Sequence, residues 1–308
     1  MIKVVFFGTP VIGLKSLEYL YSSDKFNVCA VVTQPDKPAG RGNKLKMSPI
    51  KEFALKNGIP VFQPVSIRKD LEVQNELKKI EPDFFVTFAF GQILSQDVLD
   101  IPKFETVNLH ASLLPKYRGA NPIQRAIING DKETGICTMI TELGLDCGDV
   151  CMRKVIQIPD NMNCVDLYEK VSEMSPELIE KTLIGLFSGS MTPEKQCKDG
   201  ICMADKLNKD ETEIDWSKSA LDIHNLVRGI YKFPSAYFKH NGKIIKVLET
   251  RVLDKNGECG KFISISKEGI EVGCGKGCIM LVRVKPEGKG EMSARDWGNG
   301  LKNGSKRN

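Results

Sequence analysis

The chain has 308 residues, of which 41% are hydrophobic and 27% are charged. This composition is typical of a globular protein and excludes a fibrous or wholly disordered chain. The length exceeds that of one typical core, so two domains are expected. The apolar run at the N-terminus is too short for a signal peptide, and no stretch approaches the roughly 18 apolar residues that a membrane span requires. We therefore expect a cytoplasmic protein that does not contact a membrane.

The ten cysteines and three histidines do not suggest a metal site. In a long cytosolic chain, cysteines are expected to be reduced and to pack as small apolar residues. Cys147 and Cys151 are separated by three residues rather than two, as are Cys274 and Cys278, and no histidine pair lies nearby. Because no closed set of zinc ligands can be assembled from these spacings, no metal is expected.

Charge is distributed unevenly along the chain. From Lys206 onward there are 20 Lys and Arg against 13 Asp and Glu, whereas the preceding part has 24 against 26. A basic C-terminal third suggests a polyanionic partner. A merely solvated, Lys-rich surface would have the same composition, so charge alone leaves both interpretations open.

The first half alternates strand and helix signals. Near-continuous apolar runs predict buried strands, and apolar residues at helical spacing predict helices between them. The expected strands are residues 3–7, 28–32, 84–88, 106–109 and 136–140, and the expected helices are residues 14–21, 70–80 and 165–187. Pro176 is expected to break or restart the last helix. The pattern predicts an α/β domain, a Rossmann-like parallel sheet with both faces covered.

The composition and periodicity of the sequence change after Phe187. Residues 188–204 are polar and aperiodic, as in a linker, and residues 215–229 offer one helix. Short strand candidates then follow at residues 236–239, 243–248, 261–264, 270–272 and 278–284. Asn241-Gly242 is the signal of a tight hairpin, and the series predicts a small OB-like β-barrel, a fold that often binds nucleic acid. We expect three parts: a catalytic domain at 1–188, a linker at 189–205 and the barrel domain at 206–308.

The densest group of chemically useful residues ends the strand at 106–109. Asn108 and His110 are two residues apart, so their side chains share one face of the strand, at the end where parallel sheets place ligands. Asp146 follows in a glycine-bracketed loop. Amide, imidazole and carboxylate together can transfer an activated acyl group to an amine, because the amide stabilises the oxyanion and the imidazole handles the proton. A satisfied polar pair in a turn would account for Asn-x-His equally well.

The segments NLHASLLPKYRGANPIQ and ETGICTMITELGLDCGDV resemble the formyltransferase family that uses 10-formyltetrahydrofolate. The resemblance implies a catalytic trio of Asn108, His110 and Asp146, in which the first two hold the oxyanion and Asp146 keeps His110 poised. It also implies 10-formyltetrahydrofolate as the co-substrate. It assigns the folate pocket to Asp146 and two segments: Phe88, Phe90, Gly91, Gln92, Ile93 and Leu94, and Ser112, Leu113, Leu114 and Pro115.

Residues 33–51 resemble a loop of those family members that act on methionyl-tRNA, and relatives that formylate nucleotides or sugars lack this loop. The resemblance implies a basic arm that contacts initiator methionyl-tRNA through Lys37, Arg41, Lys44 and Lys46. Cys147 departs from the usual family pattern, and so do residues 231–235. Three alternatives stay open: transfer to a nucleotide sugar or nucleotide, hydrolysis of 10-formyltetrahydrofolate, and a non-catalytic RNA-binding protein. No amphipathic stripe is left over for a dimer, so a monomer is expected.

Overall fold

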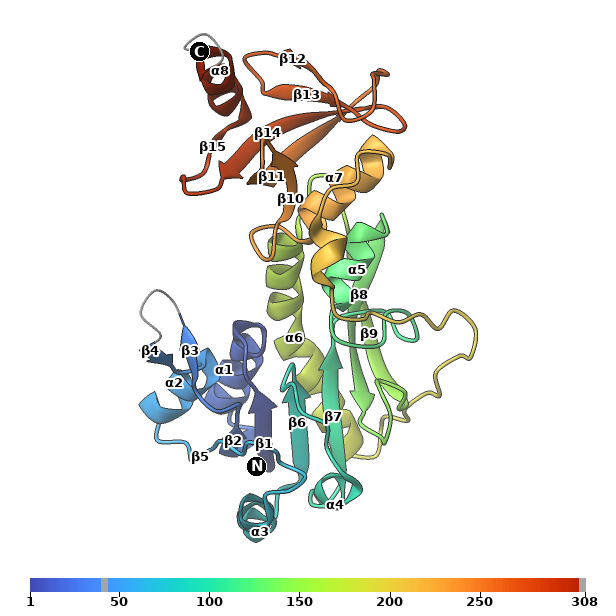
Figure 1. Ribbon diagram of the computed structural model, residues 1–308. Helices are drawn as coiled ribbons and strands as arrows, with labels where there is room; N and C mark the ends of the chain where they lie inside the picture. The colour runs from blue at the N-terminus through green and yellow to red at the C-terminus, as the bar shows by residue number, and fades with distance from the viewer. Residues whose placement is uncertain (40–43, 305–308) are drawn as a thin grey trace. The chain divides into compact units, whose positions relative to one another are not determined.

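The computed structural model describes residues 1–39 and 44–304. The chain divides into two compact units (Figure 1). The first unit comprises Met1–Gly119, Thr134–Gln157 and Tyr168–Ala204. The second unit comprises Ala120–Glu133, Ile158–Leu167 and the chain from Asp205 onward. Among the described residues, no helix is long and apolar enough to cross a membrane.

A seven-stranded sheet with the order β5-β2-β1-β6-β7-β8-β9 forms the centre of the first unit (Figure 1). Its strands are β1 (Ile2–Gly8), β2 (Phe26–Val32), β5 (Val61–Phe62), β6 (Phe84–Phe88), β7 (Glu105–His110), β8 (Glu133–Ile140) and β9 (Val150–Gln157). The pairings from β5 to β7 are parallel, as predicted, but β8 runs antiparallel to β7. Strands β5 and β9 and the short strands β3 (Lys37–Ala39) and β4 (Lys44–Lys46) were not predicted from the sequence.

Alternation along the strands gives the sheet two apolar faces, and helices are needed to cover them. One face contributes Val5, Phe7 and Phe85 to a cluster with Leu77 and Val98 from two helices. Of the helices that the structure describes, five belong wholly or largely to this unit: α1 (Leu14–Ser22), α2 (Pro49–Lys56), α3 (Leu71–Ile80), α4 (Gln96–Leu99) and α6 (Cys164–Phe187). A 3-10 turn at Val11–Gly13 leads directly into α1.

Helix α6 runs without interruption through Pro176, so the predicted break is wrong. A proline inside a helix leaves the carbonyl four residues earlier without its usual N–H donor. Here that carbonyl belongs to Ser172, and it accepts a hydrogen bond from Ser175 Oγ at 2.9 Å. A side-chain donor therefore replaces the missing backbone donor, and the helix continues.

The second unit contains an antiparallel sheet with the order β10-β11-β14-β13-β12, and β15 pairs with β14. Its strands are β10 (Ala236–His240), β11 (Lys243–Leu253), β12 (Phe262–Ile265), β13 (Ile270–Gly273), β14 (Cys278–Pro286) and β15 (Met292–Ser293). The predicted hairpin is confirmed, because Asn241 and Gly242 have φ values of 48° and 75° between β10 and β11. Although β10 and β12 are opposite ends of the strand order, His240 stacks on Phe262 with ring centroids 5.3 Å apart. The sheet is therefore strongly curled.

Four helical segments complete the second unit: α5 (Pro122–Ile128), a 3-10 turn at Lys209–Thr212, α7 (Ala220–Gly229) and α8 (Ala294–Gly304). Helix α7 packs on α5 so closely that a Cβ on Gly229 would lie 2.6 Å from Ile128 Cγ1. Trp297 of α8 contacts the rings of Phe238, His240 and Phe262. The predicted C-terminal β domain is confirmed, whereas α5 and α8 were not predicted.

Candidate active site

The carboxyl end of β7 brings together the residues that the Asn-x-His pattern singles out. Asn108 and His110 lie on the same face of this strand, and the side chain of His110 is almost fully buried, with 6% exposed. His110 Nδ1 lies 3.5 Å from Asp146 Oδ2. The structure thus places the imidazole and the carboxylate of the predicted trio side by side.

Two groups determine the orientation of the His110 ring. Nε2 lies 2.9 Å from the carbonyl oxygen of Tyr117, which can only accept a hydrogen bond, so Nε2 carries a hydrogen and donates it. Nδ1 is left facing the carboxylate of Asp146. Sequence reasoning did not identify Tyr117, because its contribution comes from the backbone.

Asp146 is held in an unusual backbone conformation. Its φ is 48°, in the left-handed region that non-glycine residues occupy at a cost of about 1–2 kcal/mol. The backbone N–H of Gly119 donates to its Oδ2 at 2.8 Å, which orients the carboxylate. The loop is also tight, because a Cβ on Gly148 would lie 2.0 Å from the carbonyl oxygen of Ile140. These contacts explain why a glycine-bracketed loop carries this aspartate.

Thr87 orients the amide of Asn108. The two residues are register partners on β6 and β7, and Thr87 Oγ1 donates a hydrogen bond to Asn108 Oδ1 at 2.7 Å. Because the amide oxygen is occupied by a donor, the Nδ2 group remains available as a donor. Asn108 is only partly buried, so this donor can reach a ligand. An oriented amide donor beside a histidine is suited to stabilising a developing oxyanion.

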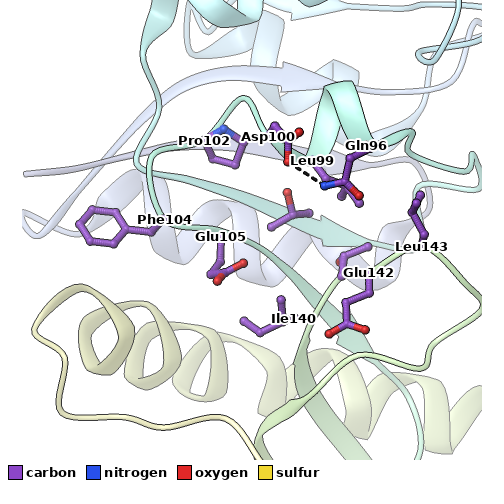
Figure 2. A pocket seen from close by; sticks show the side chains of 11 residues that line it. Gln96, Leu99, Asp100, Pro102, Phe104, Glu105, Ile140, Glu142 and Leu143 are labelled. Carbon is purple, nitrogen blue, oxygen red and sulfur yellow. Dashed lines mark hydrogen bonds between the residues drawn. The ribbon is translucent and has the colours of Figure 1, made fainter. Parts of the chain in front are cut away.

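A cavity of about 640 Å³ opens at the amino end of β7 (Figure 2). Its lining residues come from the α4 region, the start of β7 and the loop after β8: Gln96, Leu99, Asp100, Pro102, Phe104, Glu105, Thr106, Ile140, Thr141, Glu142 and Leu143. Thr106 lies two residues before Asn108, on the same strand face. The loop that contributes Thr141 and Glu142 continues to Asp146. The cavity therefore borders the two segments that carry the trio.

The cavity has an acidic rim and unused hydroxyl groups. Burial raises the pKa of Glu105, and the neighbouring Glu142 carboxylate raises it further. Burial, together with the negative charge of Glu105, raises the pKa of Cys151 to about 12. Within the described part of the chain, the buried hydroxyls of Thr106 and Thr141 have no hydrogen-bond partner. Both oxygens are almost completely shielded from solvent, although their residues line the cavity, so the accessible polar groups of the rim are the carboxylates of Glu105 and Glu142.

Comparison with known proteins connects this geometry to a family. A protein-family model described as formyl transferase matches residues 2–183, and a second, described as formyl transferase, C-terminal domain, matches residues 206–302. The chain belongs to the formyl transferase family. Curated relatives described as methionyl-tRNA formyltransferase are similar to it along nearly its whole length. That of Clostridium novyi (strain NT) is 45% identical over 96% of both chains, and that of Clostridium acetobutylicum is 45% identical over 99% of both.

Solved structures of other formyl transferases have the same fold. The N-formyltransferase of Helicobacter canadensis, solved with folinic acid and dTDP-3-aminofucose, has a TM-score of 0.68 at 23% identity, covering 91% of this chain and 99% of that one. The methionyl-tRNA formyltransferase of Clostridium thermocellum has a TM-score of 0.58 at 16% identity, covering 84% and 96%. At these identities the likeness concerns the fold alone.

The first segment assigned to folate is mostly directed into the protein core of this formyl transferase. Phe88, Phe90 and Leu94 are at most 7% exposed, and Phe88 lies on the strand face opposite Thr87. Gln92 uses its amide internally, with Oε1 accepting from Ile67 N and Nε2 donating to the carbonyl of Pro64. The remaining members differ: Gly91 is exposed, and the side chain of Ile93 is 73% exposed. Among the side chains of this segment, that of Ile93 is the most accessible to a ligand.

The second assigned segment, Ser112 to Pro115, follows the trio strand directly. Ser112 is fully buried, and its Oγ donates to the carbonyl of Lys116 at 2.6 Å, which closes a turn. Leu114 is buried as well, whereas Leu113 and Pro115 are half-buried. The segment thus supports the loop that leads to Tyr117, and Leu113 and Pro115 are its more accessible members.

The predicted basic arm contains a short hairpin. Lys37 of β3 and Lys46 of β4 are exposed and directly paired across the two strands. Like charges in this arrangement repel each other, so an anion between them would be stabilising. The backbone of Lys44 belongs to β4, whereas Arg41 lies outside the described residues. Within the arm, the Asp36 carboxylate forms an ion pair with Lys51 Nζ at 2.6 Å.

Proposed function

We propose that the chain transfers the formyl group of 10-formyltetrahydrofolate to the α-amino group of methionine on initiator methionyl-tRNA, for translation initiation. The observation that carries the proposal is the arrangement around His110, with its Nε2 bound to a carbonyl, its Nδ1 facing Asp146, and the oriented Asn108 amide on the same strand face. The identity to methionyl-tRNA formyltransferases over nearly the whole chain supports this acceptor.

The proposed reaction needs a stabilised oxygen and a proton acceptor. The amine attacks the formyl carbon, the bond from that carbon to N10 of the folate breaks, N10 takes up a proton and the amine loses one. Asn108 Nδ2 donates a hydrogen bond to the formyl oxygen as negative charge develops there. His110 receives the proton of the amine at Nδ1, and Asp146 stabilises the resulting imidazolium. The donor is already activated, so no covalent enzyme intermediate is required.

The cavity at the start of β7 suits the ring end of the co-substrate. The pterin edge carries an amino group and a ring N–H, two donors that a carboxylate such as Glu105 or Glu142 can accept. The Thr106 hydroxyl lies about 6–7 Å along the strand from Asn108, at roughly 3.3 Å per residue. A pterin beside Thr106 would therefore place N10 near the amide of Asn108.

We propose that residues 1–188 form the catalytic domain, 189–205 the linker and 206–308 a domain that binds the tRNA backbone. The basic balance of the C-terminal third and the paired lysines of the arm support this assignment. Lys37, Arg41, Lys44 and Lys46 would contact phosphates of the acceptor arm. The enzyme would act as a monomer in the cytoplasm, where initiator tRNA is charged, and sedimentation at micromolar concentration would test the oligomeric state.

The deciding experiment compares acceptors. Purified chain, 10-formyltetrahydrofolate and either methionyl-tRNA or an amino-sugar nucleotide are incubated, and formylated product is measured. Formylation of methionyl-tRNA alone is expected. Formylation of the sugar alone would refute the proposed acceptor, and release of formate without an acceptor would indicate a hydrolase.

A further inference from the structure

The segment between α6 and residue 205 is bound to the active-site loops along much of its length. Glu194 exchanges both backbone hydrogen bonds with Val150 at the start of β9, at 2.8 Å each. Farther along, Arg118 N donates to the carbonyl of Cys202 at 3.0 Å, and Ala204 N donates to the carbonyl of Arg118 at 2.6 Å. The segment proposed as the linker is therefore hydrogen-bonded to the loops that border the trio.

Gln196, midway along this segment, bridges two active-site loops with one side chain. Its Nε2 donates to the carbonyl oxygens of Asp146 and Gly148, both at 2.8 Å. Its Oε1 accepts from Nε and Nη2 of Arg118, at 3.1 and 2.7 Å. The carbonyls only accept and the guanidinium only donates, so the amide has one satisfied orientation. A glutamine thus matches both groups of partners, and a glutamate does not.

The residues that Gln196 joins flank the contacts of His110 and Asp146. Arg118 follows Tyr117, whose carbonyl accepts from His110 Nε2, and precedes Gly119, whose N–H donates to Asp146 Oδ2. Gln196 therefore closes a loop of contacts around the imidazole and the carboxylate. The left-handed backbone of Asp146 persists only where its surroundings hold it, and the bond to its carbonyl oxygen is one such restraint.

We propose that Gln196 is a positioning residue for the formyl transfer, one that sets the Asp146 carboxylate against His110 without itself touching a substrate. The inference rests on the proposed role of the His110–Asp146 pair and is independent of the identity of the acceptor. It also links residues 191–204 to catalysis, because a displacement of this segment would displace the Asp146 carboxylate.

Gln196→Glu tests the proposal with little change in shape. The carboxylate still accepts from Arg118, but it has no N–H for the carbonyls of Asp146 and Gly148 and is repelled by them. The expected result is a kcat about 10- to 100-fold lower, with KM values for both substrates within about twofold of the wild type, because misplacing a supporting group acts on the reacting geometry. Gln196→Met, which keeps the length and loses both contacts, is expected to behave similarly. Cys197→Ser, at the exposed neighbouring position, is the matched control and is expected to retain wild-type rates.

An NMR measurement that needs no turnover distinguishes a positioning role of Gln196 from a general effect on the stability of the fold. The protein has three histidines, so imidazole ¹⁵N shifts can be assigned with His224 and His240 variants. In Gln196→Glu the His110 signals are expected to move, while those of His224 and His240 and the melting temperature stay near wild type. An unchanged kcat, unchanged His110 signals, or a loss of activity that follows a loss of folded protein would each overturn the proposal. A wild-type chain inactive on methionyl-tRNA would refute the proposed acceptor alone, because the NMR comparison needs no acceptor.

Discussion

Thr87 offers a sharp test of how the Asn108 amide works. Thr87→Val removes the hydroxyl that donates to Asn108 Oδ1 at 2.7 Å and leaves a side chain of nearly the same shape in a buried strand. Without this donor, the amide can turn over and point its oxygen at the developing negative charge. The loss should therefore appear in kcat rather than in either KM.

The expected magnitude follows from the strength of one hydrogen bond. A net contribution of about 1 kcal/mol favours the productive amide orientation by roughly fivefold, so its removal leaves the two orientations about equally populated. The productive fraction then falls from about five sixths to about one half, so we expect kcat to fall about twofold. Asn108→Ala, which removes the donor altogether, should lower kcat by about 10²- to 10³-fold.

Initial rates of four variants measure the coupling. Thr87→Val combined with Asn108→Ala should lose no more activity than Asn108→Ala alone, because Thr87 acts only through the amide. Thr87→Ser retains a hydroxyl and is the matched control, expected near wild-type rates. A double variant whose loss equals the product of the two single losses would refute the reasoning, as would a Thr87→Val loss as large as that of Asn108→Ala.

Three further outcomes are expected. Asp146→Asn keeps an oxygen for the Gly119 N–H and should lower kcat by about 10²- to 10⁴-fold in initial-rate assays, so near-normal turnover would contradict the assigned role. Burial raises the pKa of Glu105, so the protonated side chain favours the folded state and its ionisation destabilises the fold. This stabilisation is fully present below the pKa of Glu105 in the unfolded chain and is lost as pH rises through its pKa in the folded protein. Glu105→Gln should therefore raise the melting temperature at pH 7 more than at pH 4.5, and an equal gain at both would count against this explanation. Lys37→Ala should weaken methionyl-tRNA binding and reduce the slope of log affinity against log salt by about 0.7–0.9, leaving folate binding unchanged. The control for loss of one surface charge is Lys79→Ala on α3, where the lysine pairs with Glu76, and it should leave that slope unchanged.

The sequence predicted those parts of the fold that short stretches of the chain determine by themselves. Apolar runs mark strands buried on both faces, and Asn-x-His at a strand end marks the centre of the site. The antiparallel β8 could not be foreseen, because its pairing with β7 depends on contacts between distant segments. Pro176 indicates a helix break by every local rule, yet the neighbouring Ser175 supplies the missing donor.

The unpredicted site residues share one property: their role appears only when segments meet. Thr87 resembles any strand threonine until β6 and β7 pair in register. Tyr117 contributes a carbonyl, which every residue type possesses. Gln196 lies in a polar segment that has no periodicity. In each case the residue type does not indicate a role in the site, and the role becomes visible only in the folded geometry.

The packing of α5 against α7 has a consequence for biosynthesis. Both helices belong to the second unit, yet Ile128 leaves the ribosome about 100 residues before Gly229, the glycine that receives it. At about 5–20 residues per second, this interval is roughly 5–20 s. During that time the nascent chain presents a helix whose docking partner does not yet exist. A chaperone that covers apolar helices at the exit tunnel would therefore bind this chain early, and slow codons between the two helices would prolong the exposure.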